Sequence, residues 1–316
     1  MPRLFSTLCA LAVIMAACTD RPPQTNDNLR IVSSVAPITS LVSDVAGQAA
    51  NISGLVPEGI NSHTFEPKPS ASRLLREADI IFVNGLHLEE PILKLARKNL
   101  KKGARIVELG DAAISRKEWI FDFSFPLAKG DPNPHLWTNP VYATRYIEII
   151  RDELSLADPS HSKDFRKNHL RIAGKIDELD KATRASTKTV SPNKRKLLTY
   201  HDSFPYFARE YGWQVIGAIQ PSDFSEPTAS EITRLIDQIR AENIPAIFGS
   251  EVFPSKVLEQ IAKHSGARYI DDLRDDDLPG NTGDPQHNYI GLMKFNLITM
   301  ITAMGGDASA LESIQP

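Results

Sequence analysis

The strongest constraint on the fold is a repeated alternation of short apolar, β-rich stretches with helix-like segments. Four such stretches occupy residues 29–35, 50–56, 79–83 and 105–109, and four more occupy residues 196–200, 214–219, 246–249 and 267–270. Between them apolar residues recur at helical spacing, as at Ile38, Leu41 and Val45. Strands that alternate with helices of this length are typical of parallel βαβ units. The pattern therefore predicts an α/β protein with two four-stranded, mainly parallel sheets flanked by helices.

A highly charged stretch from residue 159 to 189 separates the two sets of strands. Its apolar residues Phe165, Ile172, Ile176 and Leu179 recur at helical spacing. A continuous helix of this length would reach roughly 45 Å, which is longer than one small domain. We interpret it as one long linking helix, with two shorter helices and a bend as the alternative. The predicted division is an N-terminal α/β lobe at 29–158, the linking helix at 159–190 and a C-terminal α/β lobe at 191–316.

The first eighteen residues differ from the rest of the chain. Arg3 precedes an apolar run of 12 residues, from 4 to 15, which is too short to cross a bilayer and is typical of a secretory signal. Ala16, Ala17 and Cys18 resemble the end of a bacterial lipoprotein signal, although Met15 departs from the usual Leu, Val or Ile. A plain secretory signal cut nearby is the alternative. Residues 19–28 are polar and contain proline, as expected of a flexible tether.

The predicted signal places the protein outside the cytoplasm, in the periplasm or at the cell surface, with a lipid anchor on Cys18. Cys9 would be removed with the signal, so the mature chain has no free thiol and any metal site must use His, Asp and Glu. The formal net charge of −3 gives no basic footprint for nucleic acid. A glycine-rich phosphate loop is absent from the sequence, so nothing indicates a nucleotide site.

Four candidate ligands follow predicted strands. His63 lies in the loop after the second strand and His135 in the loop region after the fourth, while His201 and Asp271 directly follow strands of the second set. Ligands of open parallel sheets bind beyond the carboxyl ends of the strands, where these residues fall. Each residue alone is weak evidence, because loop histidines are usually solvated and an Asp at a strand end is often a cap. Together, three imidazoles and one carboxylate suit a cation such as Zn(II).

Five short motifs also carry a family resemblance. They are SHTFEP at 62–67, NGL at 84–86, PHLW at 134–137, YHDSF at 200–204 and YID at 269–271. With these motifs, and over nearly the whole mature chain, the sequence resembles the metal-binding receptors of ABC-type zinc and manganese importers, the cluster 9 or cluster A-I solute-binding proteins. The resemblance implies two lobes joined by a rigid helix, with one buried metal held by His63, His135, His201 and Asp271. It also implies a monomer that delivers the metal to a separate permease and ATPase without turning over a substrate.

The third ligand position bears on the identity of the metal. In the family that this chain resembles, it is Glu in many manganese receptors and His in many zinc receptors, and here it is His201. Imidazole favours zinc, whereas manganese prefers oxygen ligands. Zinc receptors often carry a His-rich loop before the second ligand, but residues 114–133 contain no histidine. Zinc is the leading prediction, with manganese and iron as alternatives.

Further polar residues lie near the expected site. Glu251 follows the strand that ends at residue 249. It is either the fourth metal ligand in place of Asp271 or an acceptor that orients a ligand histidine. Asp202 and Glu66 have the same orienting potential. His87 follows the strand at 79–83 and either lines the metal entrance or is an exposed loop residue.

Other residues have plainer interpretations. The acidic run at residues 275–277 and the histidines at 161, 169, 264 and 287 are expected at the surface. Trp137 and Phe204, beside two ligands in the sequence, are expected to help keep water from the site.

Two rival classes of function remain at this stage. A zinc hydrolase would hold the metal by three protein ligands and a water, with Glu251 or Asp202 as general base, but its common His-Glu-x-x-His motif is absent from the sequence. A receptor for an organic solute, or an adhesin, could use the same fold, since function belongs to the site.

Overall fold

The computed structural model describes residues 28–220, 225–250, 252 and 256–316. The predicted signal and lipid-bearing Cys18, and the tether up to residue 27, lie outside the described residues. Glu251 does too.

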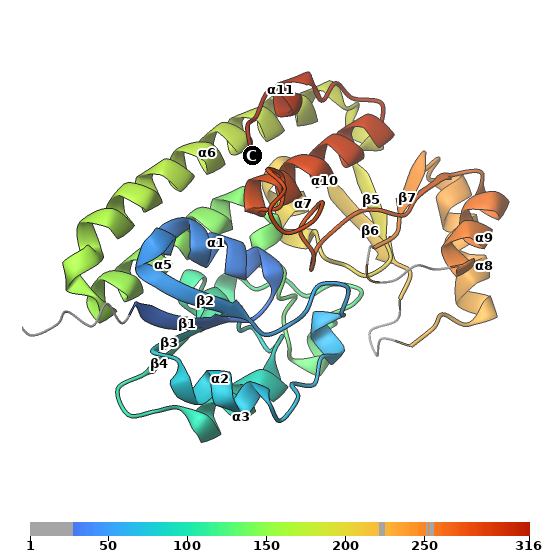
Figure 1. Cartoon of the computed structure of the whole chain (residues 1–316). Coiled ribbons are helices and arrows are strands. Elements are labelled where there is room, and N and C mark those ends of the chain that lie inside the picture. The colour runs from blue at the N-terminus through green and yellow to red at the C-terminus, as the bar shows by residue number, and fades with distance from the viewer. Residues whose placement is uncertain (1–27, 221–224, 251, 253–255) are drawn as a thin grey trace, which may run out of the picture.

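The described part of the chain contains eight strands in two separate parallel sheets (Figure 1). The first sheet comprises β1 (Leu29–Ser33), β2 (Ala50–Gly54), β3 (Ile80–Val83) and β4 (Arg105–Glu108). The second comprises β5 (Lys196–Thr199), β6 (Gln214–Ala218), β7 (Ala246–Phe248) and β8 (Arg268–Ile270). Each predicted apolar stretch thus contains a strand, and the predicted fold class is confirmed.

The two sheets share one topology. The strand orders are β2-β1-β3-β4 and β6-β5-β7-β8, so in each sheet the first strand lies between the second and the third. The central strand β3 is buried along its whole length, and its residues Ile80 and Phe82 are fully inaccessible. Apolar runs without alternation are expected of such strands, because helices cover both faces of a parallel sheet.

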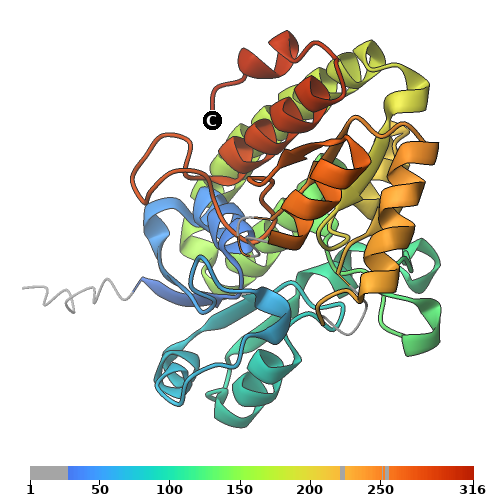
Figure 2. The ribbon, with the colours of Figure 1, turned by 90° about the vertical axis from the view of Figure 1, so that its right-hand side faces the viewer.

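Eleven α-helices accompany the strands among the described residues. They are α1 (Ala36–Ala46), α2 (Ala71–Glu77), α3 (Glu90–Asn99), α4 (Leu109–Ala113), α5 (Pro140–Ala157), α6 (Ser162–Thr189), α7 (Pro205–Tyr211), α8 (Ala229–Ala241), α9 (Lys256–Ser265), α10 (Tyr289–Ala303) and α11 (Ser309–Glu312). Around the first sheet, α2 and α3 lie on one face and α1 and α5 on the other (Figures 1 and 2). In the part of the chain that the structure describes, no helix has both the length and the apolar character needed to cross a membrane.

The long charged stretch forms a single helix, α6, of 28 residues. At 1.5 Å per residue it spans about 42 Å, and Figure 1 shows it running past both sheets. Its buried face carries the four apolar residues predicted for it, Phe165, Ile172, Ile176 and Leu179. The alternative of two shorter helices is therefore wrong. The division into lobes at residues 158 and 191 stays a prediction.

The end of the chain returns from the second sheet to the first. Helix α10 packs against both α6 and α1. Its first residue, Tyr289, donates its backbone N–H to the Ser40 hydroxyl at 2.9 Å and its own hydroxyl to the carbonyl of Trp137 at 2.8 Å. These two bonds fix the end of the loop between β8 and α10 where α10 begins.

Candidate metal centre

His63 is positioned by a short 3-10 turn after β2. The turn, Ser62–Thr64, begins at Asn61, whose side-chain oxygen accepts the backbone N–H of His63 at 2.9 Å. An Asn before a helical turn is a favourable cap because its side chain satisfies an N–H that the turn leaves open. The ring of His63 is partly buried and lies against Phe125, with ring centroids 5.5 Å apart.

His135 comes from the segment that leads into α5 and is completely buried. The side-chain oxygen of Asn133 accepts its backbone N–H at 2.9 Å and lies 2.9 Å from its ring Nδ1. A 3-10 turn, Leu136–Thr138, follows at once and contributes Trp137, whose ring centroid lies 5.0 Å from that of His135. The segment is held in place before α5 begins.

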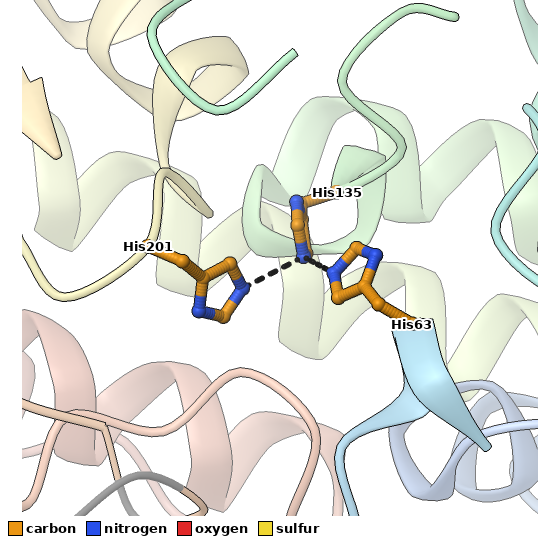
Figure 3. Close-up of side chains that lie close together, drawn as sticks. All are labelled: His63, His135 and His201. Carbon is orange, nitrogen blue, oxygen red and sulfur yellow. Dashed lines mark hydrogen bonds between the residues drawn. The ribbon is translucent and has the colours of Figure 1, made fainter. Parts of the chain in front are cut away.

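His201 follows β5 directly and is 2% exposed. Because the strand ends at the carboxyl edge of the second sheet, the imidazole projects from that edge towards the loops of the first sheet, where it meets His135 (Figure 3). The peptide that follows is tied to the first sheet's loops: the N–H of Asp202 donates to the Ser124 hydroxyl at 3.1 Å.

The three histidines converge with their Nε2 atoms (Figure 3). The Nε2 of His135 lies 3.1 Å from that of His63 and 3.2 Å from that of His201. Among the described residues these three form a group with ligand atoms within 4.8 Å of one another, as a metal ion requires. Imidazole nitrogens gathered this closely are a donor arrangement by which proteins bind zinc. The structure thus brings together the three histidines of the four predicted ligands.

The carboxylate beside the histidines belongs to Asp275. Its Oδ2 lies 2.7 Å from the Nε2 of His201 and 3.8 Å from that of His135, and the residue is 2% exposed. Asp271, which the sequence analysis placed there, is exposed at the start of the loop after β8. Residues 271–274 separate β8 from Asp275, and it is Asp275, not Asp271, whose carboxylate lies beside the histidines in the structure.

The whole acidic run is buried, contrary to the expectation of a solvated loop. Asp276 is 3% exposed and accepts the backbone N–H and the hydroxyl of Ser62 at 3.0 and 2.9 Å. Asp277 accepts the backbone N–H of Gly59 at 2.9 and 2.7 Å. These donors lie in the loop of the first sheet that carries His63. The run therefore binds this loop to the loop after β8, and its burial is possible because the distant donors satisfy its oxygens.

Burial sets the protonation of the site. Burial, and next the neighbouring His201, lower the pKa of His63 to about 3. Burial, then His63 and His201, lower the pKa of His135 well below its ordinary value. Burial, the largest single influence, raises the pKa of Asp275, but His201, His63 and Ser203 together outweigh it and the pKa is lowered. At neutral pH these residues offer two neutral imidazoles and one carboxylate, a donor set suited to a cation.

The three further predicted site residues that the structure describes have different surroundings. Asp202 is completely buried; burial, and then Asp122, raise its pKa well above the ordinary value. The side chain of His87 is 47% exposed, near Glu90 and Asp131, and the residue lines a pocket of about 190 Å³ that reaches His63. Glu66 is exposed and has no contact with the three histidines among the described interactions. Glu251 lies outside the described residues.

Aromatic side chains enclose the centre. Trp137 is fully buried and its Nε1–H donates to the carbonyl of Asp275 at 2.8 Å, which ties the His135 segment to the loop after β8. Phe204 is 1% exposed, but its ring packs against Phe207, with centroids 6.4 Å apart, and its part in keeping water from the site stays a prediction. Phe125, which the sequence analysis did not single out, lies beside both His63 and His135. No local signal marks it, because it is one of several aromatic residues in an irregular loop.

Of the other histidines, two were wrongly expected at the surface. His169 is buried at 7% exposure, on the inner face of α6. The side chain of His287 is 13% exposed and lies 3.5 Å from Glu58. Neither belongs to the group around His135.

Comparison with known proteins agrees with this geometry. Residues 31–303 match the family model of the periplasmic zinc-uptake complex component A. The iron-binding protein YfeA of Yersinia pestis is 27% identical over 95% of this chain and 93% of its own length. The manganese-binding lipoprotein MntA of Halalkalibacterium halodurans is 25% identical over 94% of this chain and 96% of its own. The structure of the periplasmic zinc-binding protein TroA of Treponema pallidum superposes with a TM-score of 0.78 at 25% identity, covering 87% of this chain and 98% of that one.

The lowered pKa of His63 predicts that the stability of the metal-free protein depends on pH. Unfolded His63 takes up a proton near pH 6.5, whereas the folded residue stays neutral down to about pH 3. Between these values the unfolded state binds more protons, so this residue makes the free energy of unfolding fall as the pH falls, by up to about 1.4 kcal/mol per pH unit. We therefore expect the free energy of unfolding, measured with urea on metal-free protein between pH 7.5 and 5, to change less steeply with pH in His63→Gln than in wild type.

The comparison between variants is needed because other groups also make the free energy of unfolding depend on pH. The lowered pKa of His135 acts in the same sense as that of His63, and two buried carboxyl groups act in the opposite sense. Burial raises the pKa of Glu89 to about 7, and burial with the charge of Asp275 raises that of Asp276 to about 7. His264→Gln, at an exposed position, is the matched control and should keep the wild-type slope. If the free energy of unfolding had the same pH dependence in wild type and in His63→Gln, the lowered pKa of His63 would be contradicted.

Proposed function

Since the chain belongs to the family of the periplasmic zinc-uptake complex component A, we propose that it captures one Zn(II) ion between its two sheets and delivers it to a membrane permease. Membership of this family makes the protein an extracytoplasmic metal-binding receptor of an ABC importer and not an enzyme. The metal is its cargo. The observation that carries the proposal is the convergence of the three histidine Nε2 atoms beside the Oδ2 of Asp275.

We assign four ligands to the ion: His63, His135, His201 and Asp275. Each is brought by a different loop at the carboxyl edges of the sheets, two from each sheet. Four protein donors complete the tetrahedral shell that zinc prefers in closed sites. A hydrolase needs an open position for water on the metal, and four protein ligands leave none.

Zinc is favoured over manganese and iron by the donor set. Three nitrogens and one carboxylate suit zinc, whereas manganese prefers sites rich in oxygen. At a given site of this kind the intrinsic affinity for zinc also exceeds that for Mn(II) and Fe(II). Relatives are named for iron and for manganese as well, so metal competition is the direct test.

We further propose that Cys18 carries a lipid that anchors the receptor at the membrane. The Ala16-Ala17-Cys18 sequence supports this, and MntA is named as a lipoprotein. The anchor would keep the receptor near its permease and ATPase partners, and we expect a monomer.

Substitution distinguishes the two carboxylate candidates. Asp275→Asn removes the charge beside His201 and should weaken zinc binding at least about 30-fold, the equivalent of about 2 kcal/mol for a buried charged partner. Asp271→Asn, at an exposed position, should change the affinity by less than about twofold, within the usual effect of a surface substitution. Isothermal titration of metal-free protein measures both. A strong loss in Asp271→Asn together with a normal Asp275→Asn would restore the original prediction.

Metal selectivity tests the zinc proposal itself. Protein purified without chelator should contain about one zinc per chain by elemental analysis, and zinc should displace manganese in competition. His201→Glu exchanges a nitrogen donor for an oxygen and should narrow the zinc-over-manganese preference by about tenfold, or about 1.4 kcal/mol. Wild-type protein that prefers manganese would overturn the zinc assignment while leaving the receptor function intact.

Cell fractionation tests the lipid anchor. Wild-type protein should sediment with the membrane, and Cys18→Ser should release it, because the variant has no thiol to acylate. A Cys9→Ser variant, changed inside the predicted signal, should remain in the membrane fraction. Retention of Cys18→Ser on the membrane would show that another segment anchors the protein.

A further inference from the structure

The carboxamide of Asn133 contacts both sheets' loops at the centre of the site. The residue is completely buried. Its Oδ1 faces the backbone N–H and the ring Nδ1 of His135, both at 2.9 Å. Its Nδ2 donates to the Oδ2 of Asp122 at 2.7 Å and to the backbone carbonyl of Asp202. One neutral side chain thus connects a ligand of the first sheet to the residue that follows His201.

These partners allow only one orientation of the amide. A backbone N–H only donates, and a backbone carbonyl only accepts. The Oδ1 of Asn133 must therefore face the N–H of His135, and the Nδ2 must face the carbonyl of Asp202. The opposite orientation would set donor against donor and acceptor against acceptor in a buried place, at a cost of roughly 1–3 kcal/mol for each group left unsatisfied.

The second acceptor, Asp122, is itself fixed. Its Oδ1 accepts the backbone N–H groups of Ser124 and Phe125 at 3.1 and 2.9 Å, and its own N–H donates to the carbonyl of Phe125 at 2.9 Å. This closed turn leaves Oδ2 directed at Asn133. The amide has no freedom to rotate away from His135.

A fixed acceptor opposite Nδ1 determines the tautomer of His135. A neutral imidazole carries one proton, and the ring nitrogen that faces an acceptor must hold it. The proton is therefore on Nδ1, and Nε2 carries the lone pair. That Nε2 is the atom that lies 3.1 and 3.2 Å from the Nε2 atoms of His63 and His201.

We propose that Asn133 is a positioning residue that holds His135 in its Nδ1–H tautomer, with Nε2 ready to bind the metal before the metal arrives. The inference rests on the proposed metal site and deepens it. An acceptor on the far side of a ligand imidazole also makes the ligand more basic, and loss of such a partner typically lowers metal affinity 10- to 100-fold. A carboxylate could not replace the amide fully, because its second oxygen would face Asp122 and the carbonyl of Asp202, both acceptors.

The test reads the tautomer directly in metal-free protein. In ¹⁵N-histidine-labelled wild type, two-bond proton–nitrogen correlation spectra should show His135 with Nδ1 protonated and Nε2 bare at pH 7.5. The resonance is assigned by its loss in His135→Gln. Asn133→Leu, of similar volume without polar atoms, should abolish the preference for the Nδ1–H form. Wild-type His135 protonated on Nε2 would overturn the proposal, whether or not any variant folds.

Two further variants separate positioning from general destabilisation. Asn133→Asp keeps an acceptor for Nδ1 and should retain the Nδ1–H tautomer even though it loses the donor to Asp202. Asn139→Leu removes a neighbouring buried amide that bonds to Val141 and Tyr206 and not to a ligand, and should leave the His135 tautomer unchanged. A shift of tautomer in Asn139→Leu equal to that in Asn133→Leu would contradict the specific role of Asn133.

Zinc titration completes the experiment and keeps the two proposals distinguishable. Asn133→Leu should bind zinc 10- to 100-fold more weakly than wild type, and Asn139→Leu should bind within about threefold of wild type. Wild-type affinity in an Asn133→Leu variant whose tautomer has changed would overturn the positioning role. Wild-type protein that binds no zinc, manganese or iron would instead refute the proposed function, and the tautomer measurement would remain valid.

Discussion

The centre of this structure is built on the burial of neutral imidazoles around one carboxylate where two parallel sheets meet. Buried polar groups must find partners, because a group left without one costs free energy that a folded protein can rarely spare. The surroundings of the site supply them. Trp137 donates to the carbonyl of Asp275, Ser62 donates to Asp276, and Asn133 accepts from His135. Residues outside the proposed ligand set therefore determine where the proposed ligands lie.

Much of the fold could be predicted from the sequence because its signals are local. Each strand is a short apolar run, and the long helix α6 shows its buried face through residues such as Ile172 and Ile176. His201 was predictable because it follows a strand directly and therefore lies at the carboxyl edge of the sheet. His63 and His135 stand in loops, and there the family resemblance added information that spacing alone does not contain.

The carboxylate proposed as the fourth ligand could not be predicted in the same way. Asp271 has the local signal, since it follows β8 at once, but it is exposed. Asp275 and Asp276 lie in an acidic run that would ordinarily be solvated. Their burial depends on His201 and Ser62, which lie 74 and 214 residues away in the chain. The role of Asn133 could not be predicted for a similar reason. In the sequence, Asn-Pro is typical of a simple turn, and only the fold places the carbonyl of Asp202 beside the Asn133 side chain.

Two hydrogen bonds connect the loops of one sheet to the loops of the other, across the seam between the sheets. Each joins a neighbour of one proposed ligand to a neighbour of another. Ser62, beside His63, bonds to Asp276, beside Asp275; Asn133, two residues before His135, bonds to Asp202, beside His201. A cation that needs longer bonds would push a ligand and its bonded neighbour outward together. We expect the seam to respond to ionic radius, so that the relative position of the two sheets depends on the identity of the enclosed ion. A permease that docks over this seam could then distinguish a correctly loaded receptor without contacting the metal.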